Sequence, residues 1–167
     1  MPDHEACADS NLQEYACRLR AAAVCIREGR VLLVRHEHPR AAGPYWVPPG
    51  GGVLSGESLR AAALRELKEE TGCEGEAVGV LGFREVLKPE GMVFEVFLEV
   101  ALKGQCAPER LECPAGDVLK EARWFTEEAL GEVQVYPEAL ADWLRDSQRH
   151  TIPLDRLCMA PVVIRGR

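Results

Sequence analysis

Three glutamates, Glu66, Glu69 and Glu70, have the spacing of side chains that share one side of a helix. At about 100° per residue, the apolar Ala63 and Leu67 fall in one sector, which should be the buried face. Glu66 and Glu70 project into that same sector, and Glu69 lies at its edge. A solvated acidic face would lie opposite the apolar residues, so the pattern indicates a role for these carboxylates other than solubility.

Carboxylates on a buried face need a positive partner, because each would otherwise cost on the order of a few kcal/mol. A divalent cation such as Mg²⁺ or Mn²⁺ supplies that charge, since oxygen ligands at this spacing can converge on it. The chain also has a formal net charge of −7, so an anionic substrate would require a local cation. The pattern therefore predicts a divalent-metal site that receives an anionic substrate.

The segment that carries these acids has clear boundaries. A helix is predicted over residues Leu59–Thr71, with Ser58 as its N-cap and Gly72 as its terminator. Gly50–Gly52 come shortly before it. Three glycines alone would be a flexible turn, but beside an acidic helix they favour a close approach of the backbone to a metal or phosphate.

The remaining elements must position this helix, and the hydrophobic patterning predicts a layered α/β fold. A hairpin is predicted around Glu28-Gly29, and a second pair of strands around the turn Pro89–Gly91. The predicted strands are 21–27, 31–35, 45–47, 77–87, 92–102 and 122–125; residues 106–121 are predicted to be a loop, Thr126 to cap a short helix, and Pro137 to about Arg149 to form a final amphipathic helix.

Over 23 residues the chain resembles the Nudix box, G-x5-E-x7-R-E-U-x-E-E-x-G-U, in which U is an aliphatic residue. The fixed letters are matched by Gly51, Glu57, Arg65, Glu66, Leu67, Glu69, Glu70 and Gly72. Cys73 stands at the last aliphatic position and packs as a small hydrophobe. The strand pattern over roughly residues 20–149 is similar to that of the same family.

The resemblance implies a Nudix fold, in which a mixed β-sheet is sandwiched between α-helices (α/β/α). It also implies hydrolysis of nucleoside diphosphates linked to another moiety. Mg²⁺ or Mn²⁺ would be ligated by Glu66, Glu69 and Glu70, often with the carbonyl of Gly50. Arg65 would orient a glutamate, with Glu69 as its i+4 neighbour. The structural residues of the box would be Gly51, Gly72 and Glu57, which would brace the loop.

The general base stays open. Glu66 or Glu69 inside the box are candidates, and so are three acids of the loop before Trp124, namely Glu112, Asp117 and Glu121. Candidate phosphate-binding residues outside the box are Arg35, His36, Arg40 and Arg84. Trp46, Tyr45 and Phe83 are candidates to stack a base, with core packing as the alternative.

We expect the substrate to be a small nucleotide, and Pro89 favours one type. It stands sixteen residues after Cys73, where many ADP-ribose pyrophosphatases of the family carry a proline. ADP-ribose or a nucleotide sugar is therefore the preferred substrate. One alternative is a pyrophosphatase for oxidised nucleoside triphosphates. A non-catalytic nucleotide sensor is the alternative of another class, but the complete set of box glutamates argues against it.

Composition and length set the wider expectations. With 167 residues we expect a flexible lead-in at 1–17, the hydrolase domain at 18–150, and a tail at 151–167 that packs on the domain or on a partner in a homodimer. Seven cysteines without C-x-x-C spacing predict free thiols rather than zinc or disulfides. An acidic start without an apolar run, and no membrane-length segment, predict a cytoplasmic protein with no membrane or nucleic-acid partner.

Overall fold

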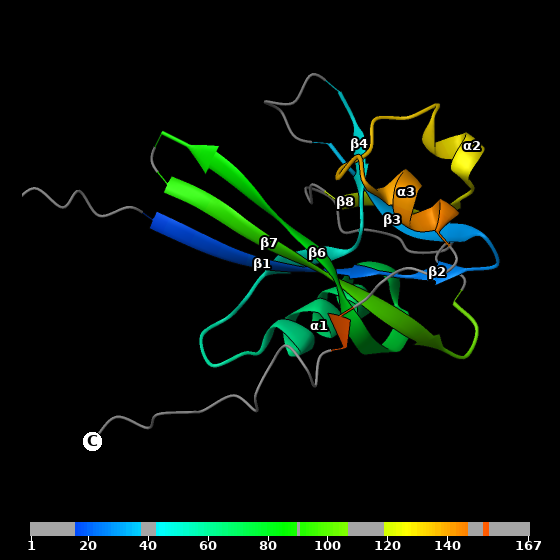
Figure 1. The fold of residues 1–167 in the computed structure, drawn as a ribbon. Helices are drawn as coiled ribbons and strands as arrows, with labels where there is room; N and C mark the ends of the chain where they lie inside the picture. Colours follow the sequence, from blue (N-terminus) through cyan, green and yellow to red (C-terminus); the bar gives the residue numbers. More distant parts are fainter. Residues whose placement is uncertain (1–15, 38–42, 90, 107–118, 147–151, 154–167) are drawn as a thin grey trace, which may run out of the picture.

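The computed structural model describes residues 16–37, 43–89, 91–106, 119–146 and 152–153. Two β-sheets and three helices make up this part of the chain (Figure 1). The elements in chain order are β1 (Ala16–Val24), β2 (Ile26–Arg27), β3 (Arg30–His36), β4 (Tyr45–Val47), β5 (Gly50–Gly52), α1 (Leu59–Thr71), β6 (Glu74–Lys88), β7 (Gly91–Lys103), β8 (Leu119–Phe125), α2 (Glu127–Leu130), α3 (Leu140–Arg145) and β9 (Ile152–Pro153).

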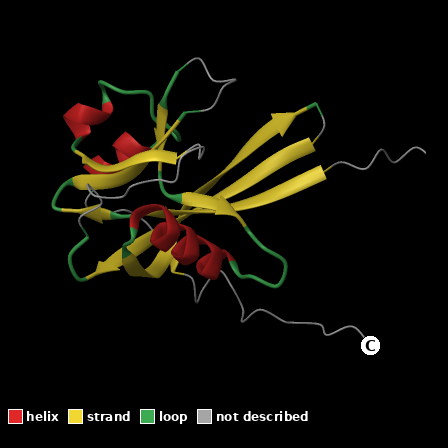
Figure 2. Cartoon of the chain, turned by 180° about the vertical axis from the view of Figure 1, so that it is seen from behind, coloured by secondary structure: helices red, strands yellow, loops and turns green. Residues whose placement is uncertain are grey.

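The first sheet is mixed and has the order β5-β1-β7-β6-β9, in which β1 and β7 run parallel. The second sheet is antiparallel, with β3 between β4 and β8 and paired with β2 as well. Helix α1 packs on β1 and β5 on one side of the molecule, and α2 and α3 lie beside the second sheet on the other (Figure 2). This arrangement confirms the predicted α/β fold with helices on both sides.

Two clusters of buried apolar side chains fill the spaces between these layers. The first lies between α1 and the first sheet and includes Ala63, Leu67 and Leu98. The second joins the two sheets to α2 and α3 and includes Phe97, Phe125 and Leu140. Because α1 is fixed between its own cluster and the backbone of β1 and β5, its acidic side is held against the edge of the first sheet.

Local sequence signals account for the main turns and helix ends. The turn between β2 and β3 has φ of 52° at Glu28 and 69° at Gly29, as the predicted hairpin requires. Ser58 caps α1 by accepting from the amide of Ala61, and Gly72 ends it in the left-handed region at φ 68°. Helix α1 therefore occupies the residues predicted from its caps.

Several strands differ in extent from their predictions. Strand β1 begins at Ala16, within the expected lead-in and five residues earlier than the predicted strand, because its residues pair continuously with β7 from Gly91 onward. Gly50–Gly52 form strand β5 instead of a turn, since they pair with Arg20 to Ala22 of β1. β6 and β7 extend to the turn at Pro89–Gly91 by pairing with each other along their length.

The last helix is shorter than predicted and begins at Leu140 rather than Pro137. The preceding residues are held against β4: the amide of Trp46 donates to the carbonyl of Gln134, and the amide of Tyr136 donates to the carbonyl of Trp46. These hydrogen bonds keep the chain extended up to Tyr136, so the helix can start only after it.

Cys73 and Cys106 form a disulfide, which contradicts the prediction of free thiols. Their Cα atoms lie 5.3 Å apart although 33 residues separate them in the sequence. The bond ties the residue after the cap of α1 to the segment after β7, a proximity that only the fold creates. Cys25 is a buried free thiol, and burial raises its pKa to about 12.

The C-terminal tail contributes two described residues, which pair as β9 with Gly79 and Val80 of β6. The apolar segment at 160–164, expected to form a strand or meet a partner, lies outside the described residues. Within the described part of the chain, no helix is long and apolar enough to cross a membrane.

Candidate active site

The acidic side of α1 lies as its helical spacing predicts. Ala63 and Leu67 are fully buried, and the side chains of Glu66 and Glu70 are only 15% and 14% exposed. Glu69, at the edge of the sector, is 59% exposed. Two carboxylates are therefore held against the protein, and the third reaches solvent beside them.

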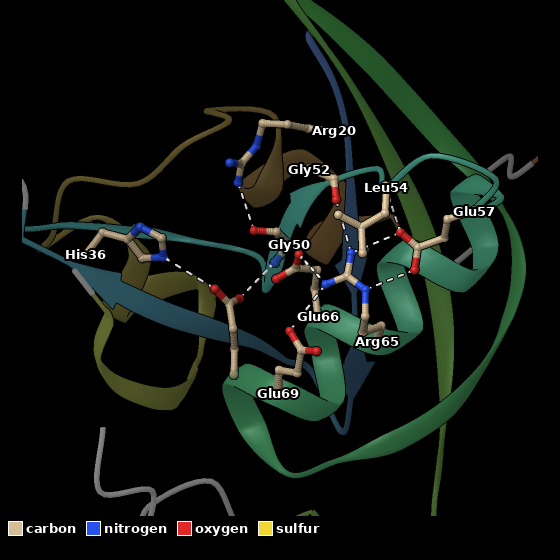
Figure 3. A network of polar contacts seen from close by, with 10 residues as sticks. Arg20, His36, Gly50, Gly52, Leu54, Glu57, Arg65, Glu66 and Glu69 are labelled. Atoms are coloured by element: carbon tan, nitrogen blue, oxygen red, sulfur yellow. Dashed lines mark hydrogen bonds and ion pairs between the residues drawn. The ribbon is translucent and has the colours of Figure 1, made fainter. Parts of the chain in front are cut away.

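Arg65 of α1 turns toward the protein, and its side chain is 26% exposed. Its guanidinium folds onto the loop before the helix and donates two hydrogen bonds to Glu57, at 2.9 and 3.0 Å (Figure 3). It also donates to Glu66 at 2.7 Å, to Glu69 at 3.2 Å and to the carbonyl of Gly52 at 3.0 Å. The side chain turns inward because its guanidinium group is the hydrogen-bond donor that all these acceptors share.

The two-fold hydrogen bond between Arg65 and Glu57 has electrostatic consequences. It lowers the pKa of Glu57, together with the amide of Leu54, which donates to the same carboxylate. In turn the hydrogen bonds that Arg65 donates to Glu57 and Glu66 raise its pKa. Glu57 thus connects the loop at Leu54 to Arg65 of the helix, and its role as a brace of the loop stays a prediction.

Gly50 joins the sheet to the acidic helix through both of its backbone groups. Its amide donates to Glu70 at 2.9 Å, and its carbonyl accepts from Arg20 at 2.8 Å. A Cβ at this position would lie 2.7 Å from the carbonyl oxygen of Ala21, so only glycine fits against β1. The carbonyl is thereby fixed beside the acidic face.

Gly51 lies under the carboxylate of Glu66. A Cβ there would lie 2.1 Å from Glu66 Oε1, so the absent side chain makes the space that the carboxylate occupies. His36 of β3 approaches from the second sheet, with its Nε2 3.9 Å from Glu70 Oε1. The acidic site is therefore built by a helix, a glycine strand and one residue of the other sheet.

The donors around Gly50 fit a divalent cation in type. The carboxylates of Glu66, Glu69 and Glu70 and the carbonyl of Gly50 supply oxygen atoms, which Mg²⁺ and Mn²⁺ prefer. Among the described residues no three acidic, histidine or cysteine side chains already converge on one point. Arg65 engages Glu66 and Glu69 instead, so a bound cation would take over contacts that this guanidinium makes.

A cavity of about 320 Å³ opens next to this site, between the first sheet and the end of the second. Most of its polar lining is cationic, and its carboxylate, Glu95, is buried. The lining residues are Arg18 and Arg20 of β1, His36, Tyr45 and Val47 of the second sheet, and Arg84, Val86, Lys88, Val93 and Glu95 of β6 and β7. Such a lining suits an anionic ligand and meets the need for local positive charge in an acidic protein.

Only some of the predicted substrate-binding residues line this cavity. Arg84 lines the cavity, as does His36. Trp46 is 5% exposed and packs edge-on against Phe125 at 4.5 Å, which is the core packing given as the alternative to stacking on a base. Phe83 is exposed and stacks on Phe94, on the sheet face away from the cavity. Arg40 lies outside the described residues.

Arg35 and Glu121 lie away from the acidic site. They face each other across β3 and β8, and Arg35 also pairs in register with Trp46. Because successive side chains of β3 point to opposite sides, Arg35 lies on the side opposite His36, and an ion pair of 3.9 Å joins Arg35 to Glu121. This register argues against Glu121 as general base. Two other loop candidates, Glu112 and Asp117, lie outside the described residues.

Sequence reasoning missed Arg18, Arg20, Glu95 and Lys88 as cavity residues. Arg18 and Arg20 carry a usable signal, because charges two residues apart at the start of an otherwise apolar strand share one face. Glu95 has no such signal. It lies in the middle of an apolar strand, and only the pairing of β7 with β1 and β6 provides its two arginine partners.

Comparison with known proteins agrees with this architecture. The model of the family described as NUDIX domain matches residues 18–147. The chain is 31% identical over 150 residues to diphosphoinositol polyphosphate phosphohydrolase 3-alpha of Homo sapiens, and the match covers 85% of this chain and 85% of that protein. It is 29% identical over 121 residues to the ADP-ribose pyrophosphatase of Methanocaldococcus jannaschii, covering 69% of this chain and 68% of that protein.

Another relative is longer than this chain. The NAD-capped RNA hydrolase of Vibrio vulnificus is 28% identical over 124 residues, and the match covers 74% of this chain but 44% of that protein. The chain therefore spans less than half the length of that relative. Among solved structures, a NUDIX hydrolase from Nitrosomonas europaea superposes with a TM-score of 0.69 at 20% identity, covering 87% and 98% of the two chains. This likeness is one of fold.

Proposed function

The chain belongs to the NUDIX domain family, and from this premise we propose that it is a hydrolase that cleaves the phosphoanhydride of a nucleoside diphosphate linked to a second moiety. The observation that carries the proposal is the acidic face of α1 beside a cationic cavity, joined through Gly50. Phosphates held in the cavity would lie next to carboxylates suited to a divalent cation.

We assign the box residues as follows. Glu66, Glu69 and Glu70, with the carbonyl of Gly50, would hold Mg²⁺ or Mn²⁺. The bound ion supplies charge stabilisation at the phosphoryl oxygens and lowers the pKa of a bound water. Glu69, the most exposed of the three, is the best placed to accept a proton from the attacking water, with Glu66 as the alternative.

Other groups of the protein would position the carboxylates and the substrate. Arg65 holds Glu57 and so fixes the loop from Gly51 to Ser58 against the helix. Gly51 leaves room for the Glu66 carboxylate. Arg20 and Arg84 line the cavity and can donate to phosphate oxygens, which a guanidinium binds through parallel hydrogen bonds. Attack on phosphorus would then release a nucleoside monophosphate and a second phosphorylated product.

ADP-ribose is the substrate that we propose first, with nucleotide sugars as its close analogues. Pro89, at the turn after Lys88 of the cavity, would stiffen the β6–β7 tip and so hold one wall of the pocket. A relative bears the name ADP-ribose pyrophosphatase. The expectation of no nucleic-acid partner stays a prediction, since another relative is named for capped RNA.

A nucleoside triphosphate is the second candidate, and the cavity supplies its argument. Arg18, Arg20, Arg84 and Lys88 gather more cationic groups than a diphosphate with a neutral ribose requires. A longer phosphate chain would engage more of them. The complete set of box glutamates disfavours a non-catalytic sensor.

A substrate panel with Mg²⁺, read by product chromatography, tests the proposal. ADP-ribose should give AMP and ribose 5-phosphate, with kcat/KM at least about tenfold above that for triphosphates, a difference of about 1.4 kcal/mol. Glu66→Gln should remove turnover, whereas Glu74→Gln, an exposed glutamate paired with Lys68 beyond the helix, should not. Pro89→Ala should reduce the preference for ADP-ribose.

Clear preference for triphosphates would overturn the choice of ADP-ribose and leave the hydrolase proposal intact. Turnover that persists in excess chelator, or in Glu66→Gln, would contradict the assignment of the metal site itself.

A further inference from the structure

Glu95 is the one charged residue that is buried among those the structure describes, with 6% of its surface exposed. It lies in the centre of the first sheet, on β7, with Arg20 opposite it on β1 and Arg84 opposite it on β6. The three side chains therefore form a row across neighbouring strands, with a carboxylate between two guanidinium groups. Loss of either arginine would leave the buried charge of Glu95 less compensated and would destabilise the fold.

The contacts of Glu95 fix both arginines. Its Oε2 accepts from Nη2 and Nε of Arg84, at 2.5 and 3.1 Å, and its Oε1 accepts from Nε of Arg20 at 3.4 Å. The Arg84 guanidinium also lies over the ring of Phe97, 5.7 Å from its centre. Arg84 is thereby held at the cavity by one edge of its guanidinium, while a guanidinium carries several further N–H donors.

The same row reaches the acidic helix. Arg20 donates from its Nη2 to the carbonyl of Gly50 (Figure 3). The amide of Gly50 in turn donates to Glu70. The polar path therefore runs from Arg84 through Glu95 and Arg20 to Gly50 and Glu70. It connects a cationic wall of the cavity to the carbonyl proposed as a metal ligand.

We infer that Glu95 is a positioning residue that sets two parts of the site at once: it aims Arg84 at substrate phosphates and holds Arg20 on the Gly50 carbonyl. The inference rests on the proposed hydrolase function and adds the chemistry of its ligand. The cavity takes the anionic phosphate groups of the substrate, and Glu95 prevents Arg20 and Arg84 from turning away from each other.

A purely structural ion pair would behave differently. Such a pair affects the free energy of unfolding, but leaves the affinity of the folded protein for anions and metal unchanged. If Glu95 positions the arginines, its loss must weaken both affinities in protein that remains folded. Binding measurements on folded protein therefore separate the two roles.

The test compares Glu95→Gln with Glu85→Gln. Glu85 neighbours Arg84 on β6, is exposed, and points to the opposite face of the sheet, so its variant makes the same charge change outside the cavity. Calorimetry measures the binding of inorganic pyrophosphate to the metal-free proteins. Electron paramagnetic resonance measures the binding of Mn²⁺ without substrate.

Glu95→Gln should weaken pyrophosphate binding about tenfold and Mn²⁺ binding about threefold, because both arginines lose their shared acceptor. In turnover it should raise KM more than it lowers kcat. Glu85→Gln should match the wild type in all these measurements. Glu95→Asp, which keeps the charge, should recover part of the pyrophosphate affinity.

Folded Glu95→Gln with wild-type affinities for pyrophosphate and Mn²⁺ would overturn the inference. If Glu95→Gln fails to fold, Arg84→Lys serves as the test variant, since it keeps the charge but loses the two-fold contact with Glu95. Wild-type pyrophosphate affinity in Arg84→Lys would also overturn the inference. Both binding assays work without turnover. Weakened binding in a protein that hydrolyses no phosphoanhydride would therefore refute the proposed function and uphold the role of Glu95.

Discussion

Replacing Gly51 with alanine should remove activity without unfolding the protein. The added Cβ would lie 2.1 Å from Oε1 and 2.7 Å from Oε2 of Glu66, whereas real Cβ contacts stay above 3.0 Å. The difference between 3.0 and 2.1 Å means that the carboxylate must move by about 0.9 Å. Misplacing a catalytic group by about 1 Å can cost on the order of a hundredfold in rate, or about 2.7 kcal/mol in the barrier.

The effect on stability should be small, because the clashing atoms are the end of a flexible side chain. Gly51 is not in the left-handed region, so alanine would stabilise by about 0.4–1 kcal/mol through the unfolded state. Loss of the partly exposed contact between Arg65 and Glu66 would cost about 0–1 kcal/mol. These contributions nearly cancel.

The assay follows product release against Mn²⁺ concentration and, separately, thermal unfolding in chelator. Gly82→Ala is the control, since its Cβ would lie 3.5 Å from the Trp143 ring, an ordinary contact. We expect kcat to fall about a hundredfold in Gly51→Ala alone, with both melting temperatures near the wild type. Wild-type kcat in folded Gly51→Ala would refute the reasoning that Gly51 makes room for Glu66.

Glu70→Gln should lower kcat at least about a hundredfold and leave the melting temperature in chelator nearly unchanged, because glutamine can still accept from the Gly50 amide; rates near wild type would exclude Glu70 as a ligand. The lowered pKa of Glu57 stabilises the fold above the ordinary carboxyl pKa, and this contribution is lost as pH falls through the folded value. Melting temperatures of wild type and Glu57→Gln should therefore differ near neutral pH and begin to converge as pH falls below the ordinary carboxyl pKa of about 4.3, and a constant difference would contradict the Arg65 contact. Trp46→Ala should destabilise by about 3–5 kcal/mol in denaturant titration, as for a core aromatic packed on Phe125; a loss of substrate affinity at unchanged stability would instead support a stacking role.

Helix α1 was predictable because the sequence signals that define it are local. Ser58, Gly72 and the spacing of Glu66 and Glu70 depend on contacts within four residues, so the helix limits and its acidic face follow from the chain alone. The box spacing likewise identified the hydrolase family.

Other parts of the site depend on strand register, which no local pattern specifies. The partners of Glu95 come from two other strands, and Trp46 became a core residue because β4 pairs with β3 beside Phe125. The contacts of Arg65 depend on the fold for a related reason. A helical wheel shows where a side chain leaves the helix, but Glu57 in the folded loop determines where its long, flexible end binds.

The sequence by itself therefore determined the family and the acidic helix, and predicted a divalent-metal site, because charge and helical periodicity are properties of neighbouring residues. Tertiary structure alone decided which cationic side chains line the cavity, where Arg65 binds, and that Cys73 meets Cys106 across 33 residues. Those contacts join segments far apart in the chain, and their geometry is set by sheet pairing and packing as a whole.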